Sequence, residues 1–118
     1  MGYDQNNVFA KILRGEIPCS KVYEDEFALA FKDINPQAPV HILVIPKGPY
    51  VSYADFASGA DDAELAGFQR AVGKVIKDQG LLVDGYRIIS NAGHSAHQEV
   101  PHYHVHILAG KDLGGKLA

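Results

Sequence analysis

The sequence is poor in sulfur and contains no tryptophan. Its 118 residues include one cysteine and one methionine. Because Cys19 has no second cysteine to pair with, an internal disulfide is excluded, and so is a zinc site built from several thiolates. A chain of this kind suits a reducing compartment, and we expect a cytoplasmic protein.

Long apolar runs and basic clusters are missing as well. No hydrophobic stretch approaches the roughly 20 residues needed to cross a bilayer, and the first residues do not have the pattern of a secretory signal peptide. Lysine and arginine number 11 against 14 acidic residues, for a formal net charge of −3. A nucleic-acid surface requires a basic face that neutralises phosphates. We therefore expect neither a membrane nor a nucleic acid among the partners.

The remaining composition is that of an ordinary globular domain. Hydrophobic residues make up 47% of the chain and charged residues 21%. A chain of this length can build one hydrophobic core but not two comfortable ones. We expect a single domain over residues 1–118.

Capping residues predict two helices. Asn7 is a suitable N-cap for a short helix that ends at Gly15. Asp61 followed by Glu64 resembles a capping box, with aspartate in place of the usual serine or threonine. A longer helix should begin there, and Gly80 is well placed to end it.

Extended apolar runs predict about five strands, and residues 47–60 are expected to form a loop. This order predicts an α+β domain in which one long and one short helix cover one face of an antiparallel sheet. So few strands leave an edge unpaired, which a second copy of the chain would cover. The expected strands span residues 21–24, 27–33, 40–46 and 86–90, with a last strand that carries the histidine triplet and is completed by residues 105–109.

Three of the six histidines occupy every second position of one extended run. Side chains alternate faces along a strand, so His102, His104 and His106 should share a face, with neighbours roughly 6 to 7 Å apart. Three imidazoles at this spacing can act on one small anion or one metal ion.

Several interpretations of the histidines are open on residue type alone. A lone histidine on an apolar strand, such as His41, is most often a hydrogen-bonded core residue, and His94 and His97 in a polar loop suit solvent. Two histidines of the triplet, with Glu99, could ligate zinc. Alternatively, a neutral imidazole is a competent nucleophile toward phosphorus near pH 7.

The triplet and its surroundings resemble a known family. The segment "HYHVHIL" is similar to the His-φ-His-φ-His-φ-φ motif of the histidine triad (HIT) family. The segments "VFAKILRGEIP", "FALAFKDINPQAPVHILVIPK", "GYRIISNAG" and "HQEVPHYHVHILAG" extend the likeness to the Hint branch over roughly residues 7 to 114. On this basis the chain is identified as a bacterial-type member.

The resemblance implies a purine nucleoside 5′-phosphoramidate hydrolase that works through a covalent nucleotidyl-histidine, without a metal or other cofactor. It implies a homodimer whose two sheets join into one. His104 matches the nucleophile. His102 and His106 match flanking residues that bind phosphate oxygens and organise the nucleophile, and His41 matches a fourth histidine beside them.

The resemblance also assigns the nucleotide contacts. Asp33 matches the carboxylate that accepts hydrogen bonds from the ribose hydroxyls, and Asn91 and Gln98 match phosphate-side contacts. Glu99 stands where animal relatives have a serine that helps protonate the leaving amine, so Glu99 and His106 are both candidates for that step. The expected apolar walls around the base are Phe9, Ile12, Ile17, Phe31 and Ile34.

Three alternatives remain open at this point. The same nucleophile would serve a dinucleoside polyphosphate hydrolase, which differs only in its leaving group. A non-catalytic nucleotide-binding or scaffold protein would keep the fold without the reaction. A zinc site is the third alternative.

Overall fold

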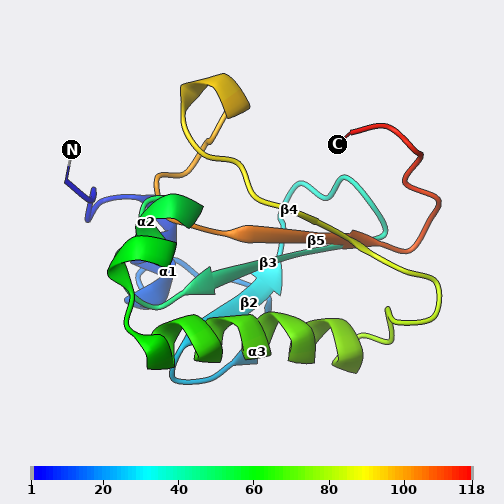
Figure 1. Cartoon of the computed structure of the whole chain (residues 1–118), viewed down its shortest axis with the longest axis horizontal. Helices are drawn as coiled ribbons and strands as arrows, with labels where there is room; N and C mark the ends of the chain where they lie inside the picture. Colours follow the sequence, from blue (N-terminus) through cyan, green and yellow to red (C-terminus); the bar gives the residue numbers. More distant parts are fainter. Residues whose placement is uncertain (1, 118) are drawn as a thin grey trace.

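An antiparallel sheet of five strands lies at the centre of the structure, a computed structural model that describes residues 2–117 (Figure 1). The strand order is β1-β2-β3-β5-β4, so the last strand in the chain is inserted between β3 and β4. This confirms the predicted sheet. The strands are β1 (Lys21–Glu24), β2 (Ala28–Lys32), β3 (Val40–Pro46), β4 (Arg87–Ile89) and β5 (Val105–Ala109).

The two predicted helices form with the predicted caps. Helix α1 spans Val8–Leu13, and its N-cap Asn7 accepts a hydrogen bond from the backbone of Ala10 at 2.9 Å. Helix α3 spans Asp62–Asp78 and begins in a complete capping box with Asp61 as N-cap. Local side-chain to backbone hydrogen bonds are sufficient to define both starts.

A third helix lies where a loop was expected. Helix α2 spans Tyr53–Gly59, so the prediction for this segment was wrong. The Ser52 hydroxyl accepts from the Asp55 backbone, and the Asp55 carboxylate accepts from the backbone N–H of Val51. The sequence gives no apolar periodicity because Phe56 is the only side chain that α2 buries.

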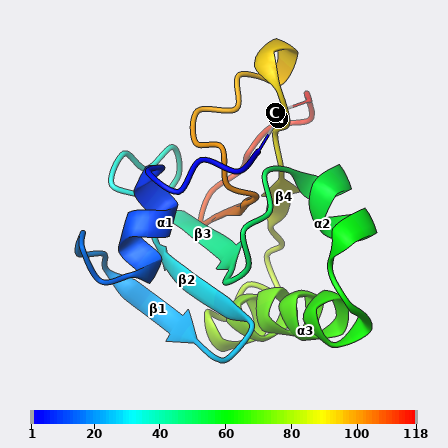
Figure 2. The ribbon, with the colours of Figure 1, turned by 90° about the vertical axis from the view of Figure 1, so that its left-hand side faces the viewer.

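The helices cover both faces of the sheet rather than one, which corrects a second expectation. Figure 2 shows α3 on one side of the strands and α1 on the other. Small residues of β2, such as Ala28 and Ala30, pack with α3 and α2 in the larger core cluster. Their neighbours Leu29 and Phe31 point the opposite way and form a smaller cluster with Phe9 of α1. Both faces of the central strands are therefore apolar.

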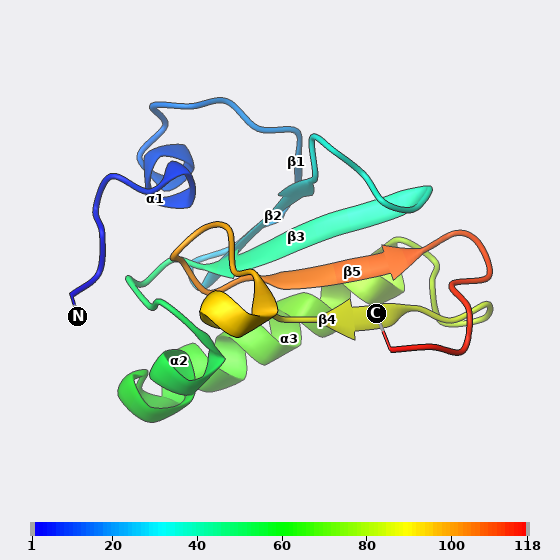
Figure 3. The same ribbon diagram turned by 90° about the horizontal axis from the view of Figure 1, so that it is seen from above.

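The alternation along β3 and β5 decides which side chains face α1. Ile42 of β3 and Ile107 of β5 belong to the core cluster beneath α3. His41, Leu43 and His106 occupy the alternate positions and face the side of the sheet that carries α1. The loop between β4 and β5 lies on this side too, as the view from above in Figure 3 shows.

Only one histidine of the triplet belongs to a strand. The strand was expected to carry all three histidines, but β5 begins only at Val105, so His102 and His104 lie in the irregular segment that leads into it. The even spacing expected for three histidines on one strand therefore does not apply to His102.

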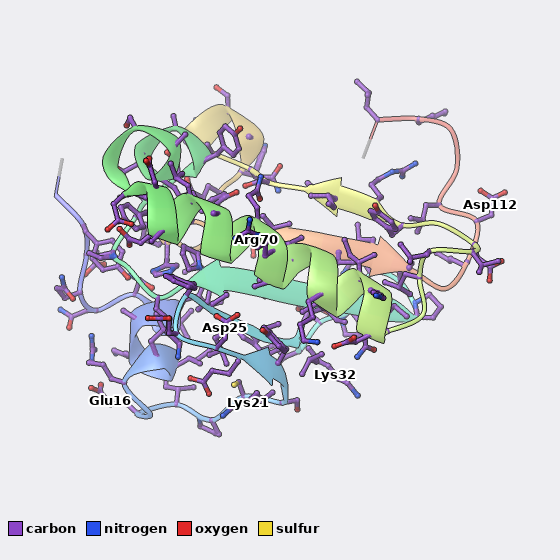
Figure 4. All side chains as sticks on the ribbon, turned by 60° about the horizontal axis from the view of Figure 1, so that its bottom comes forward. Glu16, Lys21, Asp25, Lys32, Arg70 and Asp112 are labelled. Carbon is purple, nitrogen blue, oxygen red and sulfur yellow. The ribbon has the colours of Figure 1, made fainter. Side chains whose placement is uncertain are left out.

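The outer surface carries the charged side chains. Figure 4 shows Arg70 on the outside of α3 and Lys32 and Asp112 directed into solvent, and all three are exposed. Within residues 2–117, no helix is both long and apolar enough to cross a bilayer.

Candidate functional site

A cleft of about 430 Å³ opens on the α1 side of the sheet. Its walls come from α1, the turn between β2 and β3, strands β3 and β5, and the loop before β5. Four histidines line it. The lining residues are Phe9, Asp33, Asn35, Gln37, His41, Leu43, Asn91, His97, Gln98, Glu99, Val100, His104 and His106.

His104 is held in a single tautomer by the backbone. Its Nδ1 lies 2.7 Å from the carbonyl oxygen of His102. A carbonyl oxygen can only accept, so Nδ1 carries the proton and donates it. The other ring nitrogen, Nε2, therefore keeps its lone pair. Phe9 packs edge-on against this ring, with centroids 5.0 Å apart.

Burial keeps His104 uncharged. The residue is 7% exposed, and desolvation is the largest influence that lowers the pKa of His104 below its ordinary value of 6.5. The carbonyl of His102, Asp33 and Glu99 oppose this shift. At neutral pH the ring is therefore a neutral imidazole with a lone pair available at Nε2.

His41 and His106 form a hydrogen-bonded pair with a defined direction. The backbone N–H of Gln37 donates to Nδ1 of His41 at 3.0 Å, so a neutral His41 carries its proton on Nε2. That nitrogen lies 2.9 Å from Nδ1 of His106. His41 therefore donates to His106, which leaves the proton of a neutral His106 on Nε2. The pairing arises because His106 lies opposite Leu43, one pleat along β3 from His41.

Burial also keeps His106 neutral. The pKa of His106 is lowered to about 4, first by desolvation and then by its neighbours His104 and His41, with Asp33 acting in the opposite direction. The His104 and His106 ring centroids lie 5.1 Å apart. The cleft thus presents a lone pair on one imidazole and an N–H donor on the next.

His102 lies behind the cleft and does not line it. The residue is 0% exposed. Its Nε2 lies 2.9 Å from the Pro46 carbonyl and its Nδ1 lies 2.5 Å from the Tyr3 hydroxyl. Burial, the largest influence, lowers the pKa of His102 to about 4. Because both ring nitrogens are engaged, the expected direct contact of His102 with phosphate does not fit this geometry.

Asp33 follows β2 directly and faces the cleft. One carboxylate oxygen accepts from the backbone N–H of Asn35 at 2.8 Å. The other lies 3.4 Å from Nε2 of His41. An ionised carboxylate accepts several hydrogen bonds, so Asp33 retains capacity for donors of a ligand.

One of the five expected apolar wall residues lines the cleft. Phe9 does so, and Phe31 supports it from β2 with ring centroids 5.5 Å apart. Ile12 and Ile17 are half-buried and lie outside the lining. Ile34 is 100% exposed and lies outside the lining, so its assignment as a wall stays a prediction. The alternation of β2 ends at Lys32, and Ile34 lies in the turn that follows.

Leu43 and Val100 provide apolar surface that was not assigned to the site. Leu43 was detectable, because it lies two residues after His41 on a predicted strand and so shares its face. Asn35 and Gln37 also line the cleft. Their place depends on the path of the turn, for which the sequence gives no signal beyond its prolines.

The loop before β5 brings Asn91, Gln98 and Glu99 to the cleft, as their assignment to the ligand requires. The Gln98 amide is engaged in holding this loop. It donates to the carbonyls of Val51 at 2.6 Å and Val100 at 3.0 Å, and its oxygen accepts from the Gly93 backbone.

His97 was expected to be a solvated loop residue, and it is exposed but also lines the cleft. Its backbone is left-handed, with φ of 57°. This is an uncommon conformation for any residue other than glycine.

Asp33, His41 and His106 form the group whose geometry comes nearest to a metal site, with candidate ligand atoms within 4.8 Å of one another. A metal-bound nitrogen must offer a lone pair. The Gln37 N–H on Nδ1 of His41 keeps the proton of that ring on the very nitrogen that would bind the metal. The arrangement described here therefore does not fit a metal ion.

The sheet, the histidines and the cleft together define the class of protein. Residues 14–113 match the HIT domain, and the chain belongs to this family, which confirms the resemblance. A HIT family hydrolase from Clostridium thermocellum has the same fold, with a TM-score of 0.88 and 42% identity over 98% of this chain and 99% of that one.

Two curated proteins are similar over nearly their full lengths. An uncharacterized 13.2 kDa HIT-like protein of Azospirillum brasilense is 64% identical over 112 residues, which are 95% of this chain and 92% of that protein. The purine nucleoside phosphoramidase of Escherichia coli strain K12 is 40% identical over 114 residues, which are 97% and 95% of the two chains.

Proposed function

We propose that this protein is a hydrolase that cleaves the P–N bond, or a corresponding P–O bond, of purine nucleoside 5′-phosphoramidates through a nucleotidyl-histidine intermediate. The observation that carries the proposal is the tautomer of His104, whose Nδ1–H is bonded to a backbone carbonyl and whose Nε2 is unprotonated beside the cleft. The name of the similar Escherichia coli protein supports the substrate class.

In the first step, the Nε2 lone pair of His104 attacks the α-phosphorus and the bond to the leaving nitrogen breaks. The His104 ring becomes positive as it bonds to phosphorus, and its Nδ1–H bond to the His102 carbonyl at 2.7 Å stabilises this charge. The Nε2–H of His106 donates to a phosphoryl oxygen. Donors fixed in place before the reaction are the most effective kind of electrostatic catalyst.

The departing nitrogen takes up one proton. We assign this transfer to the carboxyl group of Glu99, which is exposed, lines the cleft and relays a proton from solvent. His106 is less suited, because its Nδ1 accepts from His41 and its one ring proton, on Nε2, donates to the phosphoryl oxygen. In the second step, water attacks phosphorus, loses its proton to Glu99 and releases His104 with its lone pair restored.

The nucleoside contacts Asp33, Phe9 and Leu43, which lie beside the histidines in the cleft. The free acceptor capacity of Asp33 suits two ribose hydroxyls, which are paired donors. Phe9 and Leu43 offer apolar surface against which a purine can pack.

The test is to mix the protein with adenosine 5′-phosphoramidate, quench the reaction with denaturant and analyse it by mass spectrometry. We expect one adenylyl group on wild-type protein and none on His104→Ala, whose turnover should fall by orders of magnitude. His94→Ala is the matched control, because His94 lies in the same loop but outside the cleft lining. Activity of His104→Ala within tenfold of wild type would show that the nucleophile is wrong.

We also propose that the protein is a homodimer whose sheets join at β4. This edge strand leaves Ile88 48% exposed, and Leu82, Val83 and Tyr86 beside it are exposed as well. An unpaired apolar edge is suited to pairing with a second copy. Sedimentation velocity at micromolar concentration distinguishes a dimer from a monomer.

A further inference from the structure

The hydroxyl of Tyr3 reaches a triad histidine from the other end of the chain. It lies 2.5 Å from Nδ1 of His102, 99 positions away in sequence. The Tyr3 ring also packs edge-on against the imidazole, with centroids 5.5 Å apart. Tyr3 precedes α1, whose residue Phe9 contacts both His102 and His104. The first residues are thus joined to the segment that carries the nucleophile.

The direction of the Tyr3 bond follows from the second nitrogen of His102. Nε2 lies 2.9 Å from the Pro46 carbonyl, which can only accept, so Nε2 carries the ring proton. The neutral ring therefore has only a lone pair at Nδ1, and the Tyr3 hydroxyl is the donor. His102 is 0% exposed, so water cannot replace this donor without a rearrangement of the segment.

The same residue holds the nucleophile through its backbone. The His102 carbonyl accepts the Nδ1–H of His104 at 2.7 Å, and this bond sets the tautomer that the reaction needs. His102 lies in a bend outside any strand, and its backbone N–H bonds to Val100 at 2.8 Å. The peptide plane that contains this carbonyl is also held by the Tyr103 N–H, which donates to the Tyr50 carbonyl at 2.7 Å. The ring contacts at both nitrogens fix His102 itself at the start of that plane.

On these grounds we infer that Tyr3 is a positioning residue, which orients the nucleophile His104 by holding the ring and hence the carbonyl of His102. The inference rests on the proposed function, because it concerns the rate at which His104 attacks phosphorus. Tyr3 lies outside the cleft lining, so it should affect this rate without affecting substrate binding.

The test compares Tyr3→Phe with Tyr23→Phe. Each removes one phenolic hydroxyl that donates a short hydrogen bond, and the Tyr23 bond to Asp25, at 2.7 Å, is on the edge strand β1. We measure the single-turnover rate of adenylyl-His104 formation at saturating adenosine 5′-phosphoramidate, the KM, and urea unfolding. Rates are taken where each variant is more than nine-tenths folded.

We expect Tyr3→Phe to lower the rate of adduct formation about tenfold with KM within twofold of wild type, because small displacements of a reacting group are costly. Tyr23→Phe should keep the rate within twofold. A purely structural role for Tyr3 predicts lower stability with an unchanged adduct rate, and that result would overturn the inference.

A second measurement separates this inference from the proposed function. Histidine ¹⁵N and ¹H NMR on the ligand-free protein reports the Nδ1–H of His104 directly. We expect this proton to exchange with water at least tenfold faster in Tyr3→Phe than in Tyr23→Phe, and equal exchange would refute the positioning role. If wild-type protein formed no adduct, the proposed function would fail, while the NMR result would still decide whether Tyr3 orients His104.

Discussion

Stability should fall steeply on mild acidification because burial lowers the pKa of His102, His104 and His106, and the share of His102 can be isolated. His102 is 0% exposed and has its two ring nitrogens occupied by Tyr3 and Pro46. Burial, the largest influence on this group, lowers the pKa of His102 from 6.5 to about 4. In the unfolded chain the same ring titrates near 6.5.

The direction in which the free energy of unfolding changes with pH depends on whether the folded or the unfolded state binds more protons. Between pH 6.5 and pH 4 the unfolded state is protonated at His102 and the folded state is not, so the free energy of unfolding decreases as the pH falls. The shift corresponds to about 3 kcal/mol when complete. Between pH 7 and pH 5, the part attributable to His102 is about 2 kcal/mol.

The assay is urea unfolding of wild type and His102→Asn at pH 7 and pH 5. Asparagine removes the titrating group, and its amide oxygen, at the place of Nδ1, can still accept from the Tyr3 hydroxyl. The variant should be less stable at pH 7, but its loss of stability between the two pH values should be about 2 kcal/mol smaller than that of wild type. His94→Asn, at an exposed loop position, should show the wild-type difference. An equal pH dependence in wild type and His102→Asn would refute the reasoning.

Two further predictions concern the cleft. Asp33→Asn should raise the KM for a nucleoside phosphoramidate about tenfold, because a charge-assisted hydrogen bond to the ribose is weakened, and should change turnover of a ribose-free substrate less than twofold. The control is Asp112→Asn, which alters an equivalent turn away from the cleft. Equal effects of Asp33→Asn on both substrates would exclude a ribose role. Prolonged treatment with chelator should leave kcat/KM unchanged, since the Gln37 N–H opposes metal binding at His41, and a loss restored by added zinc would contradict this account.

The elements that depend on neighbouring residues could be predicted from the sequence. Asn7 and Asp61 cap their helices through hydrogen bonds to the backbone of a residue three positions along the chain. The β-branched run of β3 is apolar enough to define a central strand. Helix α2 has a comparable local cap at Ser52, but its packing could not be predicted in the same way. Its position depends on Phe56, which stacks on Tyr103 at 5.2 Å, a residue far along the chain.

In the candidate site, too, some features were predictable from the sequence and others depend on residues distant in the chain. His104 and His106 were recognisable from their residue type and spacing and His41 from the family resemblance, and all three line one cleft. The depth of His102 was not predictable, because it depends on β5 beginning only at Val105 and on the distant Tyr3 hydroxyl. Ile34 was assigned from the family resemblance alone, and it lies fully exposed beyond the end of β2.

The central claim is that Nε2 of His104 bonds to phosphorus, and the position of that bond can be measured directly. Wild-type protein is trapped during turnover of adenosine 5′-phosphoramidate, and its histidine peptide is examined by tandem mass spectrometry and ³¹P-coupled ¹⁵N NMR. The account predicts one adenylyl group on Nε2 of His104, since Nδ1 is committed to the His102 carbonyl. An adduct on Nδ1, on another histidine, or turnover with no adduct would contradict it.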